Sequence, residues 1–107
     1  MAMDTRKALS QREALDIVRE YKRIITPRFR TEPRVMLFGS YSKGCPRPDS
    51  DLDVAVIVPS FDGDWLEQST DISLDAIRLN VLIEPVLMQE GEPSPLYHDV
   101  MRSGIAV

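Results

Sequence analysis

Residues 37–58 read LFGSYSKGCPRPDSDLDVAVIV, and this stretch decides how the rest of the chain is organised. An apolar run ends in Gly39-Ser40, a polar loop with two prolines follows, and a second apolar run opens with Asp51-x-Asp53. Successive side chains of a strand alternate between the two faces of a sheet, so Asp51 and Asp53 project from the same face. The pattern predicts two strands joined by a stiff loop, with paired carboxylates where the second strand begins.

The paired carboxylates favour a magnesium-dependent nucleotide site. Mg²⁺ prefers one or two carboxylates together with the oxygens of a phosphate substrate, and no histidine lies nearby to suggest a softer metal. Gly39 follows a strand and has no side chain, so backbone amides can approach a phosphate closely there, and Ser40 adds a hydroxyl donor. A helical turn starting at this point would add the partial positive charge of a helix N-terminus.

The same residues resemble the signature of the nucleotidyltransferase superfamily typified by DNA polymerase beta. That signature consists of Gly-Ser, a spacer of about ten residues and then Asp-x-Asp. Here residues 41–50 separate Gly39-Ser40 from Asp51-x-Asp53. The resemblance covers roughly residues 10–105 and names a superfamily, not a substrate.

Length and charge restrict the class of protein. The chain of 107 residues is enough for one modest core, so we expect residues 1–107 to form a single domain, which the resemblance implies is a minimal nucleotidyltransferase domain. Its formal net charge of -4, with no basic run, disfavours an extended nucleic-acid partner, which requires a positive face. A single nucleoside triphosphate that arrives with metal ions is compatible with this charge.

The compartment is expected to be the cytoplasm. Cys45 is the only cysteine, so no internal disulfide can form. Residues 1–7 lack the apolar core of a signal peptide, and no apolar run approaches the length of a membrane span, so no membrane partner is expected.

Hydrophobic periodicity predicts the remaining elements. Helices are expected over residues 11–25 and 65–79 and from Pro95 to the residue before Gly104, where Leu96, Val100 and Met101 would form the buried stripe. Strands are expected over residues 34–38, 51–58 and 81–88. In the last of these, Pro85 cannot donate to a sheet ladder, which predicts an edge strand or a bulge.

The order of these elements predicts an α/β fold of the two-layer α+β kind. The resemblance implies the nucleotidyltransferase fold, a small mixed sheet with helices packed mainly on one face. The alternation of the second strand turns residues 52, 54, 56 and 58 toward those helices. Ala55, Ile57, Val86 and Met88 would then lie on the carboxylate side, where a partner protein could pack.

Glu84 interrupts the otherwise apolar third strand, and burying a lone carboxylate is costly unless it meets a cation. Nucleotidyltransferases of this superfamily carry a third carboxylate, usually an aspartate, on a strand next to the Asp-x-Asp strand. The resemblance therefore implies that Asp51, Asp53 and Glu84 are the catalytic and metal-binding residues.

The resemblance also implies the chemistry of this site. Two Mg²⁺ ions would assist transfer of a nucleoside monophosphate from ATP to an acceptor hydroxyl, with release of pyrophosphate. Gly39 and Ser40 would hold the terminal phosphates of the nucleotide. Lys43 is a weaker candidate for the same role, and Arg47 is weaker still.

The short chain resembles the minimal nucleotidyltransferases that act as antitoxins beside a small helical toxin of the HEPN type. Resembling members transfer AMP to a tyrosine of that toxin. Two alternatives remain open: a non-catalytic antitoxin or binding module with the same fold, and nucleotidyl transfer to a small molecule such as an aminoglycoside. A homo-oligomer or a hetero-oligomer is possible in each case.

Overall fold

The computed structural model describes residues 8–61 and 63–107, so the expectation drawn from residues 1–7 lies outside the described part of the chain. Within the described residues, β1 (Arg34–Phe38), β2 (Leu52–Val58), β3 (Ile83–Gln89) and β4 (Ile105–Ala106) form a sheet in the order β3-β2-β1-β4. β1 is antiparallel to β2 and to β4, whereas β2 and β3 are parallel. The predicted mixed sheet is confirmed.

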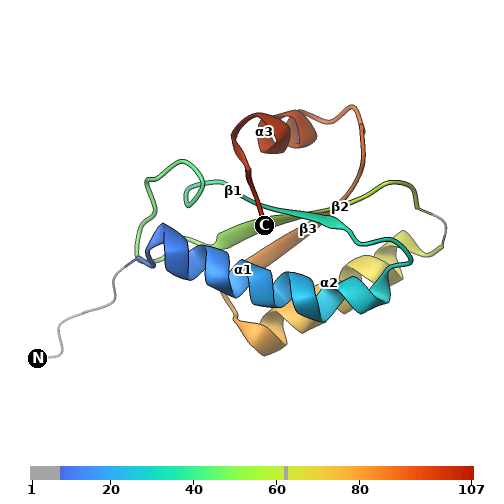
Figure 1. The fold of residues 1–107 in the computed structure, drawn as a ribbon, viewed down its shortest axis with the longest axis horizontal. Coiled ribbons are helices and arrows are strands. Elements are labelled where there is room, and N and C mark those ends of the chain that lie inside the picture. Colours follow the sequence, from blue (N-terminus) through green and yellow to red (C-terminus); the bar gives the residue numbers. More distant parts are fainter. Residues whose placement is uncertain (1–7, 62) are drawn as a thin grey trace, which may run out of the picture.

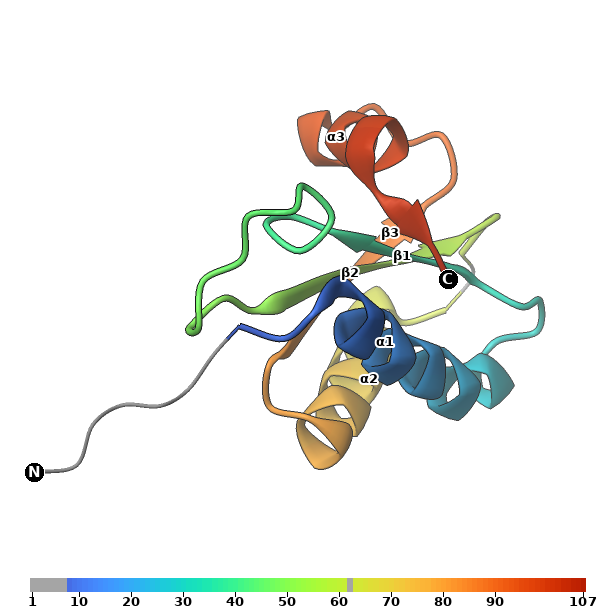
Figure 2. The same ribbon diagram turned by 60° about the vertical axis from the view of Figure 1, so that its left-hand side comes forward.

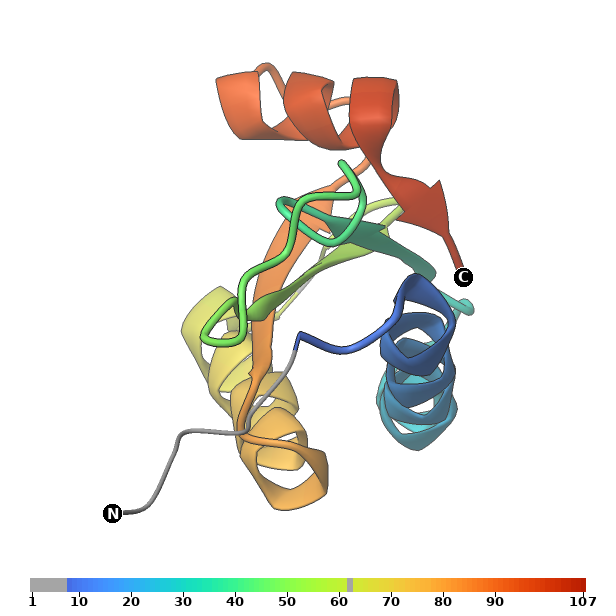
Figure 3. The same ribbon diagram turned by 90° about the vertical axis from the view of Figure 1, so that its left-hand side faces the viewer.

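Helices cover both faces of this sheet unequally (Figures 1 and 3). α1 (Gln11–Ile25) and α2 (Trp65–Leu79) lie side by side on one face, and α3 (Pro95–Ser103) lies alone on the other. A single 3-10 turn, Thr26–Arg28, follows α1 directly. The predicted bounds of α1, α2 and β1 are confirmed, and the fold is an α+β fold with most of its helical mass on one face.

Sequence explains where α1 begins and which face it buries. The Ser10 hydroxyl accepts a hydrogen bond from the Glu13 backbone N–H at 3.0 Å, and the Glu13 carboxylate accepts one from the Ser10 N–H at 2.9 Å. This capping box satisfies two free amides at the helix start. The fully buried side chains then recur at helical spacing: Ala14, Val18, Tyr21 and Ile25.

The main core lies between the sheet and the α1–α2 layer. β2 turns alternate side chains toward this layer, as predicted: Leu52, Val54, Val56 and Val58, all buried. The Tyr21 hydroxyl crosses the layer and donates a 2.6 Å hydrogen bond to the backbone carbonyl of Ile72 in α2. Burial raises the pKa of this phenol well above its usual range.

A second, smaller core lies under α3, and it corrects one expectation. Ala55, Ile57 and Met88 are buried against Tyr97 and Val100 of α3, and Val86 is partly buried beside them. The expectation that this surface receives a partner protein is therefore wrong, because the chain covers it with its own helix. The predicted stripe of α3 was also partly wrong: Leu96 is 40% exposed, and Tyr97 occupies the buried position instead.

The strands at the two edges are β3 and β4. The edge position of β3 confirms the expectation drawn from Pro85. β4 was not predicted, because a strand of only Ile105–Ala106 carries no periodic signal. No helix in the described part of the chain is both long and apolar enough to cross a membrane.

Candidate active site

The parallel pairing of β2 with β3 places two of the predicted carboxylates side by side. Asp53 is in register with Glu84, so their Cα atoms face each other across one strand spacing, which is about 5 Å. Both lie on the sheet face that α3 covers further along, where Ala55 and Ile57 are buried. Asp51 lies just before β2, two residues before Asp53.

Gly39 lies against the same cluster from the neighbouring strand. Phe38, the last residue of β1, is paired with Asp53, and Gly39 begins the turn that follows. Its φ of 73° lies in the left-handed region, and a Cβ at this position would lie 2.2 Å from Oδ2 of Asp53. Both the conformation and the contact require glycine, because any side chain here would displace the carboxylate.

The turn after Gly39 is tightly closed. The Gly39 carbonyl accepts hydrogen bonds from the Lys43 N–H at 3.1 Å and from the Ser42 hydroxyl at 2.9 Å. The Ser40 carbonyl accepts one from the Cys45 N–H at 3.1 Å. The predicted helical turn at 40–43 is thus a single closed turn, and Ser40 stays partly exposed at its start.

Tyr41 anchors this loop to the start of α1, a role that the sequence analysis missed. Its ring is 2% exposed, its hydroxyl accepts a 3.1 Å hydrogen bond from the Leu9 N–H, and its carbonyl accepts one from the Gln11 side chain at 3.2 Å. Figure 2 shows the resulting position of the loop between β1 and β2, at one end of the sheet.

The carboxylate cluster is electrostatically unbalanced. Partial burial raises the pKa of Asp53, and the nearby carboxylates of Asp51 and Glu84 raise it further. Within residues 8–61 and 63–107, no hydrogen bond or ion pair joins the side chain of any of the three to another protein group. Asp53 is thus repelled by two acidic neighbours with no protein cation to balance them, and such an arrangement attracts a cation.

The two candidate phosphate-binding cations, Lys43 and Arg47, lie in the loop between β1 and β2 and form no ion pair with the carboxylate cluster in the part of the chain that the structure describes. The Lys43 ammonium is 3.7 Å from Oδ2 of Asp99 on α3, and Asp99 also accepts a 3.1 Å hydrogen bond from Arg102. Arg47 is exposed in the loop, where its backbone N–H donates to the Ser50 hydroxyl. Asp99 was missed by the sequence analysis, because only the position of α3 brings it near the loop.

The donor chemistry of the cluster fits Mg²⁺, since three carboxylates supply the hard oxygen ligands that this ion prefers. In the conformation described, however, no group of three or more His, Cys, Asp or Glu side chains among the described residues is already gathered to hold a metal ion. Side-chain rotation would have to bring the three carboxylates together around the ion.

A cavity of about 480 Å³ lies away from these residues. It opens at the opposite end of β2, and its lining includes Arg28, Val58, Phe61 and Gln68 but none of the predicted site residues. The carboxylate cluster, not this cavity, therefore remains the candidate site.

Known proteins share the sequence pattern and the fold of this chain. The sequence matches the family described as "Nucleotidyltransferase domain" over residues 12–91. A protein of Methanocaldococcus jannaschii, described as a "putative protein adenylyltransferase", is 27% identical over 100 residues, which span 89% of this chain and 99% of that protein.

Two solved structures share the fold. A "putative nucleotidyltransferase" from Sulfolobus solfataricus superimposes with a TM-score of 0.64 at 18% identity, covering 95% of this chain and 89% of that one. A chain from the crystal structure of a mutant MntA–HpeT toxin–antitoxin superimposes with a TM-score of 0.52 at 17% identity, covering 92% of this chain and 72% of that one.

Proposed function

The chain belongs to the nucleotidyltransferase domain family, and we propose that it transfers AMP from ATP to a hydroxyl group of a partner protein. One observation carries this proposal: Asp53 lies in register with Glu84 and against Gly39, so the acidic cluster and the glycine turn occupy a single place. A nucleotide bound there would have its phosphates beside the turn and its metal ions on the carboxylates.

Asp51, Asp53 and Glu84 are the residues that would hold Mg²⁺. When bound, the ions neutralise the triphosphate and increase the acidity of the acceptor hydroxyl. The pKa of Asp53 is raised by burial and by its acidic neighbours, and a divalent cation held at the cluster would lower it again.

The chain's own residues position the reactants. Gly39 leaves room for the Asp53 carboxylate to lie against the turn, and the Ser40 hydroxyl donates to the phosphate oxygens. The acceptor oxygen attacks the α-phosphorus, the bond from that phosphorus to the bridging oxygen of the β-phosphate breaks, and pyrophosphate leaves. Glu84 is exposed at the edge strand and accepts the acceptor's proton.

We propose a helical toxin of the HEPN type as the acceptor, modified on a tyrosine, with this chain as the antitoxin. Two comparisons support the choice. The relative from M. jannaschii is described as a "putative protein adenylyltransferase", and one chain with the same fold comes from a toxin–antitoxin crystal structure. The cytoplasm is the compartment that we propose for the reaction.

The test is transfer of label to the purified partner in the presence of Mg²⁺. Label from α-³²P-ATP, but not from γ-³²P-ATP, should appear on the toxin, because the α-phosphate is retained and pyrophosphate departs. The double variant Asp51→Asn/Asp53→Asn should abolish labelling, and Asp16→Asn, at an exposed position on α1, should not.

The same variants separate the non-catalytic alternative. If the chain neutralises the toxin by contact alone, the double variant still binds and protects against the toxin fully. Loss of both labelling and protection supports the transferase, whereas protection that survives without labelling contradicts it.

A further inference from the structure

The outer face of α2 carries an apolar stripe that the described chain does not cover. Leu66, Leu74 and Ile77 are 75%, 44% and 62% exposed, and Thr70 is also exposed. The spacing of residues 66, 70, 74 and 77 places all four on one side of the helix. Val81, 76% exposed, follows in the turn after α2. Scattered apolar residues are normal on a surface, but an aligned set of this length marks an interface.

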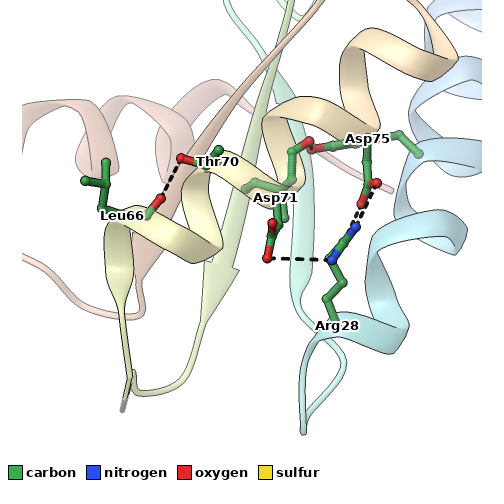
Figure 4. Close-up of polar contacts among 7 residues, drawn as sticks. Arg28, Leu66, Thr70, Asp71 and Asp75 are labelled. Atoms are coloured by element: carbon green, nitrogen blue, oxygen red, sulfur yellow. Dashed lines mark hydrogen bonds and ion pairs between the residues drawn. The ribbon is translucent and has the colours of Figure 1, made fainter.

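Thr70 is adapted to burial within this stripe. Its hydroxyl donates a 2.8 Å hydrogen bond to the Leu66 carbonyl one turn earlier. Figure 4 shows both residues on the side of α2 that points away from Arg28. The hydroxyl proton of Thr70 therefore already has an acceptor. An apolar surface can cover Thr70 without breaking a hydrogen bond.

The charges on α2 are divided between a paired set and an unpaired set. Asp71 and Asp75 both contact Arg28: Asp75 accepts two hydrogen bonds, at 2.6 and 3.0 Å, and Asp71 lies 3.7 Å away (Figure 4). In the part of the chain that the structure describes, the side chains of Glu67 and Arg78 form no ion pair and no hydrogen bond, although the Glu67 backbone N–H donates to the Asp64 carboxylate that caps the helix. These two unpaired charges have opposite signs.

Glu67 and Arg78 also lie on the same flank of the stripe, at its two ends. They are eleven residues apart, as Leu66 and Ile77 are, and eleven residues correspond to three helical turns. The midpoint of Glu67 and Arg78 falls one residue from the midpoint of Leu66 and Ile77. A second α2 can run antiparallel to the first, related to it by a two-fold axis through the middle of the stripe. Glu67 of each helix then lies opposite Arg78 of the other, so the dimer contains two such pairs.

We infer that α2 is a self-association surface, on which a second copy of the chain packs its own α2 in antiparallel orientation. The apolar stripes bury each other, and two Glu67–Arg78 pairs flank them. An isologous two-fold interface requires a surface that complements itself, and the sign and position of these charges meet that condition.

This inference does not rest on the proposed enzymatic function. α2 packs on one face of the sheet, and the carboxylate cluster lies on the other, so substitutions in the stripe leave the candidate active site unchanged. A dimer built in this way exposes both active sites.

Charge exchange tests the inference most sharply. Sedimentation equilibrium over roughly 1 µM to 1 mM should show a dimer for the unsubstituted chain. Glu67→Arg and Arg78→Glu should each raise the dissociation constant about tenfold or more, because each opposes like charges at both pairs. An equimolar mixture of the two variants should recover the dimer, since every pair in the mixed dimer again joins opposite charges.

A second variant tests the apolar stripe. Ile77→Asp should raise the dissociation constant by about 100-fold, since it places an unpaired charge at the interface. Leu96→Asp, at a 40% exposed position on α3, is the matched control and should leave the dimer intact. Circular dichroism should show unchanged helix content for both variants.

Three results would overturn the inference. The first is an unsubstituted chain that stays monomeric at every concentration. This result overturns the inference even if the α2 stripe binds a different protein. The second is a dimer that tolerates Ile77→Asp. The third is a mixture of the two charge variants that does not associate better than either variant alone.

Discussion

Gly39 and Asp53 are in direct contact, and a Cβ at position 39 would lie 2.2 Å from Oδ2 of Asp53. The two residues are separated in sequence by the whole loop between β1 and β2, and antiparallel pairing of these strands brings them together. The contact explains the spacing of the motif in physical terms. The residue after β1 must be glycine because the Asp53 carboxylate of β2 occupies the space that a side chain at position 39 would need.

Gly39→Ala is therefore expected to abolish nucleotidyl transfer by displacing Asp53. Gly44→Ala is the matched control, because Gly44 has a similar φ of 76° but no atom within 4 Å of the added Cβ. Each substitution should destabilise the protein by about 1 kcal/mol through left-handed backbone strain. Transfer assays and urea unfolding should show that only the Gly39 variant loses activity, and equal activity of both variants would contradict the assigned contact.

Asp53→Asn should raise the unfolding temperature at pH 7 in the absence of divalent metal. The pKa of Asp53 is raised in the folded state, so folding is opposed by its ionised form. The ionised Asp53 lowers the free energy of unfolding by its full amount at pH values above its raised pKa. This loss of stability disappears as the pH falls below about 4, the ordinary pKa of an aspartate carboxyl. Thermal unfolding in EDTA should thus show that the substitution stabilises the fold at neutral pH and has no effect in acid. A destabilising effect at pH 7 would show that Asp53 is not repelled by its acidic neighbours.

Arg28→Ala should destabilise the fold by about 2 kcal/mol, because it leaves Asp75 buried without its partner. This figure is reduced from that of a fully buried pair, since the Arg28 side chain is 36% exposed. Arg23→Ala is the control: Arg23 pairs with Glu20 on the exposed surface of α1, so its loss should leave the free energy of unfolding nearly unchanged. Urea denaturation of both variants measures the difference.

Lys43→Ala should raise the KM for ATP roughly tenfold with a smaller change in kcat, if the ammonium leaves Asp99 to contact a phosphate. The exchange is feasible because the Lys43–Asp99 pair is long, at 3.7 Å, and half-exposed on the lysine side. Lys43→Arg should restore part of the affinity. An unchanged KM in the alanine variant would show that Lys43 does not contact the phosphates. Its role would then be to join the loop to α3 through Asp99.

Much of the fold was predictable because local signals and packing agree. The Ser10–Glu13 capping box fixed the start of α1, and the alternation of β2 identified the side chains that face the α1–α2 layer. The juxtaposition of Asp53 with Gly39 and Glu84 in the candidate site was predictable for a different reason. Asp53 and Gly39 belong to one short stretch, and Glu84 was conspicuous as a charge within an apolar run.

The missed features depend on contacts between distant segments. Tyr97 replaces Leu96 in the buried stripe of α3 because this helix packs directly on Ala55, Ile57 and Met88. These residues lie on the sheet face that α1 and α2 do not cover. The Lys43–Asp99 pair and the Tyr41–Leu9 hydrogen bond join positions far apart in the chain. No spacing rule within one helix or strand reports such contacts.

Calorimetric titration of ATP into the metal-free protein, with and without Mg²⁺, is the most direct test of the central claim that the acidic cluster holds a metal-bound nucleotide. We expect binding only in the presence of Mg²⁺, lost in Asp53→Asn and retained in the control Asp16→Asn. Binding of equal strength by the Asp53→Asn variant, or by the unsubstituted protein without any divalent ion, would contradict it.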